Sequence, residues 1–409
     1  MRIKPFRAWR PDPAIASRVA APPYDVVDRA EAAALAHGNP FSFLHVGRSD
    51  IDVPGDVEAY DERVYLKARD NLRAFMVDGT LIQEREPSLY LYELTMFNRS
   101  QVGLVTCVHI DDYEQNVIKK HERTRKDKED DRTKHVLTLN ANAEPVFLTY
   151  EGQPFIDRLA SGEMRGRSLY DFTSSSDGVR HRVWRVKDPE AYLDAFRRVN
   201  CAYVADGHHR SASAWRAGLE RRAANPEHNG LEEYNWFLAV LFPANQLQIL
   251  PYNRVVRDLN GLAVADVIEQ IGMLGTLTKT ESPTPERPWV FGIYLPGQWY
   301  RLEIDPITII DHDPIKSLDA ELLYERILQP VLGIGDVRSD KRIDFVGGIR
   351  GTKELERRVD SGEMAIAFAL FPVRIEQVMA VSDGGGIMPP KTTWFEPKLK
   401  SGLFVHTLD

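Results

Sequence analysis

The chain has 409 residues, of which 43% are hydrophobic and 27% are charged, and its formal net charge is -8 at pH 7. This composition is typical of a globular protein with a large core and about two or three domains. The acidic balance argues against general nucleic-acid binding, because such binding needs a basic face.

The first residues and the cysteines indicate the cellular compartment of the protein. The opening MRIKPFRAWRPDP has no apolar signal region, and no run reaches the ~20 apolar residues of a membrane span. The only two cysteines, Cys107 and Cys201, lie in apolar runs. We therefore expect buried, reduced thiols, no zinc cluster, no membrane partner and a cytoplasmic location.

A stiff loop opens the chain. Pro22 and Pro23 restrict the backbone beside Tyr24 and Asp25, so these two side chains either belong to a site or cover the core.

Apolar spacing and turn residues then predict helices over 31–37 and 56–77, a hairpin of strands 89–96 and 102–110, and a strand over 145–150.

The most charged segment, 119–134, predicts a helix with many i,i+4 ion pairs. Most of these charges are expected to be solvated. Because the segment follows a β-rich region directly, its start can instead face a cleft and offer Lys119, His121 and Glu122 to a phosphate.

The stretch CAYVADGHHRSASAW, Cys201–Trp215, carries the densest chemistry. An apolar strand ends at Asp206-Gly207, and a helix is predicted to begin at His208-His209-Arg210, before Ser211. A strand, a glycine turn and a helix start together favour an anion site, since the first amides of a helix lack partners and its dipole attracts negative charge. The alternative is a capped, solvated helix start.

The second half predicts further strands and helices. Asn253 and Arg254 are expected on a turn, as turn formers or substrate contacts. Asp311, His312 and Asp313 favour a turn over a metal site, because adjacent side chains rarely converge on one ion. The predicted elements are strands at 179–187, 236–242, 343–346 and 364–371, and helices after 188, at 263–271, at 318–328 and at 354–359.

A glycine- and proline-rich loop, 383–398, closes this half. It contains Lys391, Thr392 and Lys398, which are residue types that bind phosphate. We expect this loop and the corner around Lys119–Glu122 to meet the central motif.

Eight segments, spread over nearly the entire chain, carry a family resemblance. They are APPYDVV (21–27), NPFSFLHV (39–46), IKKHERTRKDKEDDR (118–132), VADGHHRSASA (204–214), LPYNRVV (250–256), DHDPIKSLDAELL (311–323), IDFVGGIRG (343–351) and MPPKTTWFEPKLKSGLFVH (388–406). With them the whole chain resembles the DUF1015 family, and the DGHHR motif resembles the phosphate-facing turn of the ParB and sulfiredoxin superfamily, which includes free-serine kinases.

The fold class expected is α+β, a mixed sheet with surrounding helices and a ParB/sulfiredoxin-like core. The expected domains are a main domain over 1–258 that carries the central motif, a smaller α/β subdomain over 259–305, and a C-terminal segment, 306–409, that returns to the main domain.

The leading functional hypothesis is an enzyme that handles the phosphate ester of a small polar metabolite or a nucleotide. The resemblance implies serine or phosphoserine as substrate, and Mg²⁺ if a nucleotide is used. The motif does not choose between kinase, phosphatase and nucleotide hydrolase, nor does it fix the oligomeric state. The expected catalytic residues are His209, Asp206, His208 and Glu122, with His209 more important than His208; the expected phosphate or substrate contacts are Gly207, Arg210, Ser211, Lys119, His121, Lys391, Thr392 and Lys398.

Two other classes stay open. A nucleotide-responsive binding protein, like the ParB partition proteins, would use the same turn without turnover, but no basic recognition helix is present for DNA. A metabolite-binding or scaffold protein without catalysis is the third.

Overall fold

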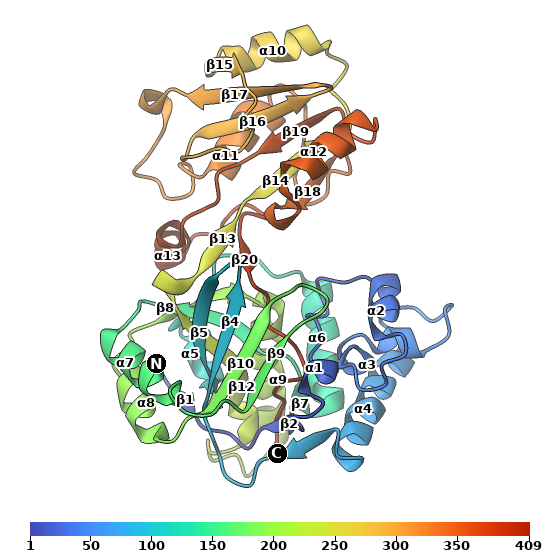
Figure 1. Cartoon of the computed structure of the whole chain (residues 1–409), viewed down its shortest axis with the longest axis vertical. Helices are drawn as coiled ribbons and strands as arrows, with labels where there is room; N and C mark the ends of the chain where they lie inside the picture. The colour runs from blue at the N-terminus through green and yellow to red at the C-terminus, as the bar shows by residue number, and fades with distance from the viewer. The chain divides into compact units, whose positions relative to one another are not determined.

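The computed structural model describes all 409 residues, and these form two compact units (Figure 1). The first unit comprises 1–247 and 397–409, and the second comprises 248–396. Residues 259–305, for which a separate subdomain was predicted, lie inside the second unit. Of the predicted returning segment, only 397–409 belongs to the first unit. None of the helices has the length and apolar character that crossing a lipid bilayer requires.

A nine-stranded mixed sheet organises the first unit. Its order is β6-β11-β8-β12-β5-β4-β10-β9, with β1 paired to β5. The β11–β6 and β12–β8 pairs are parallel and the others are antiparallel. The strands are β1 (Ile3–Lys4), β4 (Tyr90–Met96), β5 (Arg99–His109), β6 (Ile118–Lys119), β8 (Val146–Tyr150), β9 (Tyr170–Thr173), β10 (Arg180–Arg185), β11 (Ala202–Asp206) and β12 (Trp236–Pro243).

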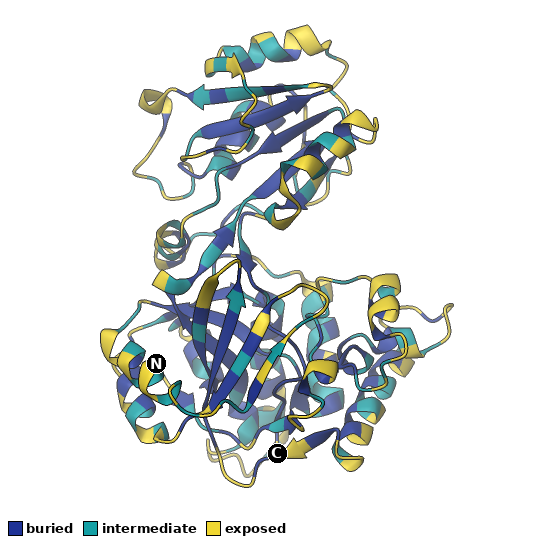
Figure 2. Ribbon diagram, viewed as in Figure 1, coloured by how far each residue is buried: buried dark blue, intermediate teal, exposed yellow.

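The centre of this sheet is buried on both faces. Almost every side chain of β12 is buried, as expected for an apolar run between two neighbours (Figure 2). The predicted hairpin is confirmed: β4 and β5 join through Phe97 and Asn98, whose φ angles of 50° and 63° suit a tight two-residue turn. With helices around the mixed sheet, the predicted α+β class is also confirmed.

Helices surround this sheet, and α6 packs against both α9 and α4. Their bounds are α1 (Ala16–Val19), α2 (Arg29–Ala36), α3 (Leu44–Gly47), α4 (Glu62–Val77), α5 (Ile110–Glu114), α6 (Lys126–Leu139), α7 (Pro154–Glu163), α8 (Pro189–Phe196) and α9 (His208–Ala224), with short 3₁₀ turns at η1 (Ser49–Asp52), η2 (Glu233–Asn235) and η3 (Ala244–Gln246).

The predicted helix over 119–134 is wrong at its start. Ile118 and Lys119 form β6, which pairs in parallel with Ala202 and Tyr203 of β11, and the helix begins only at Lys126. Helical spacing of charges is a local signal, whereas the β11 edge supplies backbone hydrogen bonds from a distant part of the chain. The pairing therefore places the corner around Lys119 beside the strand that carries the central motif.

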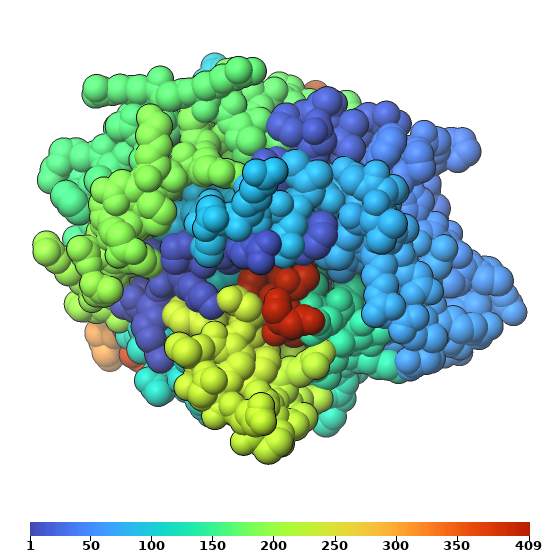
Figure 3. All heavy atoms as spheres, turned by 90° about the horizontal axis from the view of Figure 1, so that it is seen from below, coloured from blue at the N-terminus to red at the C-terminus, as the bar shows by residue number.

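The C-terminal residues are anchored in the first unit. β21 (His406–Thr407) pairs with β7 (Ala141–Asn142), and Val405 bridges to Trp9, near the two-stranded pair β2 (Trp9–Pro11) and β3 (Leu81–Gln83). Figure 3 shows the C-terminal residues, in red, seated among blue and cyan segments from the first part of the chain and a yellow-green segment from its middle.

The second unit contains a six-stranded sheet of order β15-β17-β16-β19-β14-β18, with all pairs antiparallel, and the two-stranded pair β13–β20. Apolar clusters cover both faces of the sheet, so neighbouring Val255 and Val256 belong to different clusters. The elements are β13 (Gln248–Leu250), β14 (Tyr252–Val256), α10 (Val264–Gly272), β15 (Gly275–Lys279), β16 (Val290–Leu295), β17 (Gln298–Ile304), η4 (Pro306–Thr308), α11 (Asp319–Leu323), η5 (Tyr324–Leu328), β18 (Ile343–Gly347), η6 (Gly348–Arg350), α12 (Gly351–Asp360), β19 (Ile366–Ala369), α13 (Ile375–Asp383) and β20 (Trp394–Glu396).

Three local predictions need correction. Asn253 and Arg254 lie within the buried strand β14 and not on a turn, since β18 and β19 pair on either side of it. The helix predicted over 318–328 is α-helical only to Leu323 and continues as a π-helical turn. Cys107 is buried as expected, but Cys201 is only partly buried.

Gly218 tests how tightly α9 is held. A Cβ there would lie 2.5 Å from Ile110 Cδ1 and 2.6 Å from the carbonyl oxygen of Tyr234, which is backbone. We expect Gly218→Ala to lower the free energy of unfolding by about 1–3 kcal/mol through overpacking. Gly162→Ala, in α7 with nothing within 4 Å of the new Cβ, should instead gain roughly 0.5–1 kcal/mol. Urea unfolding measures both, and equal effects would contradict the packing.

Candidate functional site

The turn between β11 and α9 forms the candidate site. Gly207 has φ of 94° and no side chain caps the start of α9. The first amide bonded within the helix is that of Ser211, which donates to the carbonyl of Gly207 at 2.8 Å. The amides of His208, His209 and Arg210 precede it, at the positive end of the helix dipole. The strand, glycine turn and helix start predicted from the sequence are confirmed.

Arg210 folds back over this turn. Its side chain is only 7% exposed, and Nη1 donates to the carbonyl of Pro145 at 2.5 Å. Nη2 lies 3.5 Å from Asp206 and 3.9 Å from Asp25, yet Nε and Nη2 are buried and make no hydrogen bond. A Cβ on Gly207 would lie 3.0 Å from Nε, so the turn needs glycine both for its φ and for this close approach.

Asp206 sits between two cations. Lys398 Nζ lies 3.4 Å from Asp206 Oδ2, and Arg210 Nη2 lies 3.5 Å from the same oxygen. Burial alone would raise the pKa of Asp206, but the charges of Lys398 and Arg210 hold it well below its usual range. The carboxylate therefore stays ionised at neutral pH and positions both cations. Lys398 thus meets the central motif, as predicted.

His208 joins the motif to the corner that follows β6. Its ring is packed edge-on against His121, with centroids 4.5 Å apart, and Nδ1 lies 3.6 Å from Glu122 Oε2. Burial lowers the pKa of His208 to about 3, against the opposing charge of Asp206. His208 is thus a neutral imidazole, and its buried Nε2 makes no hydrogen bond.

His209 has a different neighbour. Its Nε2 accepts a hydrogen bond at 3.1 Å from the amide of Arg125, the residue before α6. Burial also lowers the pKa of His209. This nitrogen is therefore occupied, and the ring helps to hold the start of α6 against α9.

The stiff N-terminal loop supplies Asp25. From the sequence, this side chain was expected either to belong to a site or to cover the core. Its carboxylate is 36% exposed and faces Arg210. The amide of Tyr24 donates to Glu144 Oε1 at 3.3 Å, and the guanidinium of Arg132 lies 4.2 Å from the Tyr24 ring centroid. Burial raises the pKa of Glu144, with Asp25 adding to the effect.

A recess opens beside Arg210. It has ≈ 390 Å³ of empty space, which includes open solvent, and Arg132, His135, Glu144 and Arg210 are among its lining residues. Arg132 and Glu144 are not among the site residues predicted from the sequence. Arg132 is one of many charged residues in 119–134, and Glu144 is a single carboxylate before β8. Neither forms a sequence pattern that would predict a role in a site.

The remaining predicted residues make contacts that do not involve the candidate anion site. Ser211 is fully buried and its Oγ donates back to the carbonyl of Gly207, so it serves the helix. Lys119 is half-buried, with Nζ 6.0 Å from the centroid of the Tyr203 ring. Lys391 and Thr392 belong to the second unit, where Lys391 lies over the Tyr252 ring and Thr392 donates to the carbonyl of Pro389.

The site combines an uncapped helix start with the cations of Arg210 and Lys398. Nowhere in the chain do three His, Cys, Asp or Glu side chains gather so as to hold a metal ion. The uncapped helix start, a buried guanidinium and a lysine can bind and neutralise a phosphate, while Asp25 can accept a proton from a hydroxyl.

Comparisons place the chain among known proteins. The model of the family described as protein of unknown function (DUF1015) matches residues 3–321. A comparison with curated protein sequences gives no match. Among solved structures, the chain is similar to a mutant free serine kinase in complex with AMP (12% identity, TM-score 0.37, covering 73% of this chain and 91% of that one) and to C-terminally truncated SbnI from Staphylococcus aureus (12%, 0.38, 74% and 87%). A conserved hypothetical protein from Pyrococcus furiosus is similar too (15%, 0.34, 74% and 95%). Similarity at this level concerns the course of the chain and carries no argument about chemistry.

Gly207→Ala tests the anion site without removing a charge. The new Cβ displaces Arg210, so we expect sulfate or phosphate to raise the melting temperature of the unaltered chain but not that of Gly207→Ala. Gly230→Ala is the matched control, because Gly230 has φ of 90° but nothing within 4 Å of the new Cβ. Both variants bear a backbone cost of roughly 1–2 kcal/mol.

Scanning fluorimetry in sulfate, against chloride at equal ionic strength, compares the two variants. Only the control should keep the sulfate-dependent rise. An equal rise in both would show that the anion binds elsewhere.

Proposed function

We propose that this chain, which belongs to the DUF1015 family of proteins of unknown function, is a phosphoryl-handling enzyme that acts on a small polar metabolite. One observation carries the proposal. Arg210 is buried at an uncapped helix start, with Nε and Nη2 free of hydrogen bonds and with two carboxylates beside it. A guanidinium buried in this way is suited to a planar or tetrahedral oxyanion.

Positioning and charge stabilisation supply most of the catalysis in phosphoryl transfer. In the proposed arrangement the amides at the start of α9 and Arg210 bind the phosphate, and Lys398 neutralises charge that develops on it. Asp206 holds both cations in place through its two ion pairs. It is a poor proton acceptor, because its pKa lies well below the usual range.

The proton acceptor is the least fixed role. The residue predicted for this role is Glu122, which is 46% exposed and lies 3.6 Å from Nδ1 of the neutral His208. Asp25 faces Arg210, the proposed phosphate-binding residue, with Oδ2 3.9 Å from Nη2. We therefore assign the acceptance of a hydroxyl proton to Asp25.

The two histidines change places relative to the expectation. His209 was expected to matter more, but its Nε2 is occupied by the amide of Arg125. His208 is neutral, and its Nε2 makes no hydrogen bond. A neutral imidazole carries one N–H, and the carboxylate beside Nδ1 favours the proton there, so Nε2 is an acceptor. We therefore give His208 the role of accepting a hydrogen bond from a substrate hydroxyl through Nε2, and His209 that of a positioning residue.

Serine and phosphoserine are the substrates to try first, because the DGHHR motif resembles that of the free-serine kinases. Mg²⁺ is included where a nucleotide is the phosphoryl donor, since it neutralises the phosphates. The arrangement serves transfer in either direction, so kinase, phosphatase and nucleotide hydrolase activities are tested together.

A second candidate is a nucleotide-responsive binding protein without turnover. The observation in its favour is that neither histidine is an activated nucleophile: one has a pKa of about 3, and the other accepts a backbone hydrogen bond. Such a protein would use the same turn for binding alone.

Turnover separates the two candidates. The purified chain is incubated with ATP, ADP or phosphoserine, with and without serine and Mg²⁺, and the products are followed by ³¹P NMR. Formation of phosphoserine or inorganic phosphate is the expected result. Nucleotide binding measured by calorimetry, without any product, would favour the second candidate.

Asp25→Asn and Glu122→Gln form a matched pair of carboxylate-to-amide changes. Both side chains are substantially exposed, so both variants should keep the fold. Asp25→Asn should lower kcat by about 10²–10⁴, the usual loss of a proton-transfer group, and Glu122→Gln should leave it nearly unchanged. The reverse order would return the base to Glu122.

A further inference from the structure

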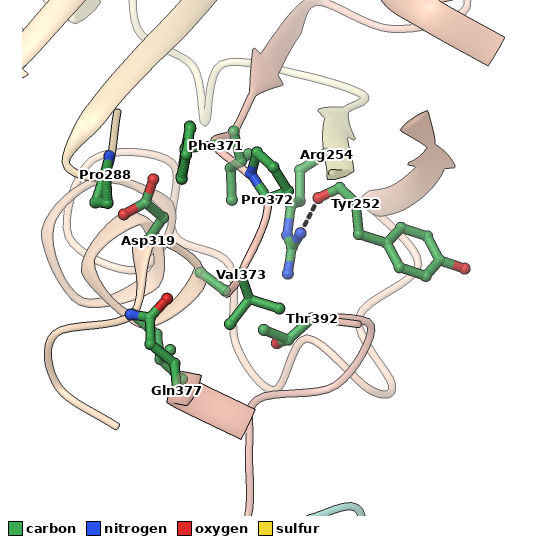
Figure 4. A pocket seen from close by; sticks show the side chains of 12 residues that line it. Tyr252, Arg254, Pro288, Asp319, Phe371, Pro372, Val373, Gln377 and Thr392 are labelled. Atoms are coloured by element: carbon green, nitrogen blue, oxygen red, sulfur yellow. Dashed lines mark hydrogen bonds between the residues drawn. The ribbon is translucent and has the colours of Figure 1, made fainter. Parts of the chain in front are cut away.

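The second unit has a recess of its own. It has ≈ 340 Å³ of empty space, which includes open solvent, and every residue that lines it belongs to the second unit. Arg254 comes from the buried strand β14, Asp319 from the first position of α11, and Gln377 from the first turn of α13. Figure 4 shows Asp319 and Gln377 on one side of the recess and the guanidinium of Arg254 on the other.

Arg254 is a buried cation without a carboxylate partner. The residue is 4% exposed, and its one hydrogen bond runs from Nη1 to the carbonyl of Tyr252. Its guanidinium also lies 5.4 Å from the centroid of the Phe345 ring. Burial lowers the pKa of Arg254 to about 10, so the group remains charged at neutral pH. A buried guanidinium that uses only one of its five donors calls for an anion.

Asp319 presents the complementary group. Oδ1 accepts from the amide of Trp289 at 2.9 Å, whereas Oδ2 is buried and has no hydrogen-bond partner. Trp289 adopts φ of 68°, which is unusual for a bulky residue and indicates local strain. Burial raises the pKa of Asp319 to about 7, although the amides of Trp289 and Phe371 and, less strongly, the charge of Arg254 oppose this. The two groups influence one another, yet they do not form an ion pair.

Most of the other lining is apolar, with Leu318, Leu370 and Phe371 among its members. From the cation, the unpartnered carboxylate oxygen and this apolar lining, the geometry points to a binding site for a small α-amino acid with an apolar side chain. The ligand carboxylate would bind Arg254, its ammonium would bind Asp319 Oδ2, and its side chain would contact the apolar lining.

Charge balance favours a zwitterion over other anions. A phosphate dianion would bring a second uncompensated negative charge next to Asp319, which is costly in a buried site. A simple carboxylate would satisfy Arg254 but leave Oδ2 without a donor. An amino acid satisfies both groups and adds no net charge. This site is independent of the phosphoryl chemistry proposed for the first unit.

Calorimetry with the full chain tests the site with three related probes. L-valine carries both charged groups, isovalerate lacks the ammonium group, and isobutylamine lacks the carboxylate. We expect L-valine to bind, isovalerate to bind at least tenfold more weakly, and isobutylamine not to bind. Absence of L-valine binding, or equal affinity for L-valine and isovalerate, would overturn the inference.

Two variants locate the binding. Asp319→Asn should reduce L-valine affinity to that of isovalerate and leave isovalerate unchanged, because only the ammonium contact is lost. Arg254→Lys should weaken both carboxylates at least tenfold, because lysine lacks the planar fork. Unchanged L-valine binding in folded Asp319→Asn would overturn the inference even if Arg254→Lys failed to fold.

The matched controls are Asp311→Asn and Arg350→Lys, which alter exposed side chains of the same unit and should leave binding unchanged. Gly207→Ala should also leave L-valine binding unchanged, which separates this site from the first unit. Loss of L-valine binding in Gly207→Ala alone would contradict the proposed location.

Discussion

The ion pairs of Arg210 determine the candidate site. A guanidinium in the interior is strongly unfavourable unless carboxylates and carbonyls surround it. Here the carbonyl of Pro145 and the carboxylates of Asp206 and Asp25 do so, and they come from three distant parts of the chain. Each of these segments is fixed by the need to satisfy one buried charge, so the loop, the strand and the helix start converge.

The two buried arginines make an instructive contrast. Arg210 has carboxylates beside it, and these raise its pKa despite burial. Arg254 has one carbonyl and an aromatic ring, and burial lowers its pKa. The first arginine is largely compensated by the protein itself, and the second is compensated far less. Under the two proposals, an arginine with nearby carboxylates binds phosphate in one unit, and an arginine without them binds a ligand carboxylate in the other.

Local signals were readable from the sequence. The apolar run before Asp206 and the glycine after it predicted the strand, turn and helix start, since each depends on neighbouring residues alone. Pairing between distant segments was not readable. The charges after Ile118 suggested a helix, but the edge of β11 made a strand there. Arg254 was predicted on a turn, because β18 and β19, the strands that pair with β14, are distant in the sequence and leave no pattern near Arg254.

The second unit interrupts the first, since residues 248–396 separate the last thirteen residues from the rest of their unit. Lys398 therefore meets Asp206 across a gap of 192 residues. During synthesis on the ribosome, Asp206 and Arg210 emerge long before Lys398, because the entire insert is translated between them. The site becomes complete only once Lys398 has been synthesised, so a chain that stops before this residue would carry the DGHHR turn without the lysine that meets Asp206.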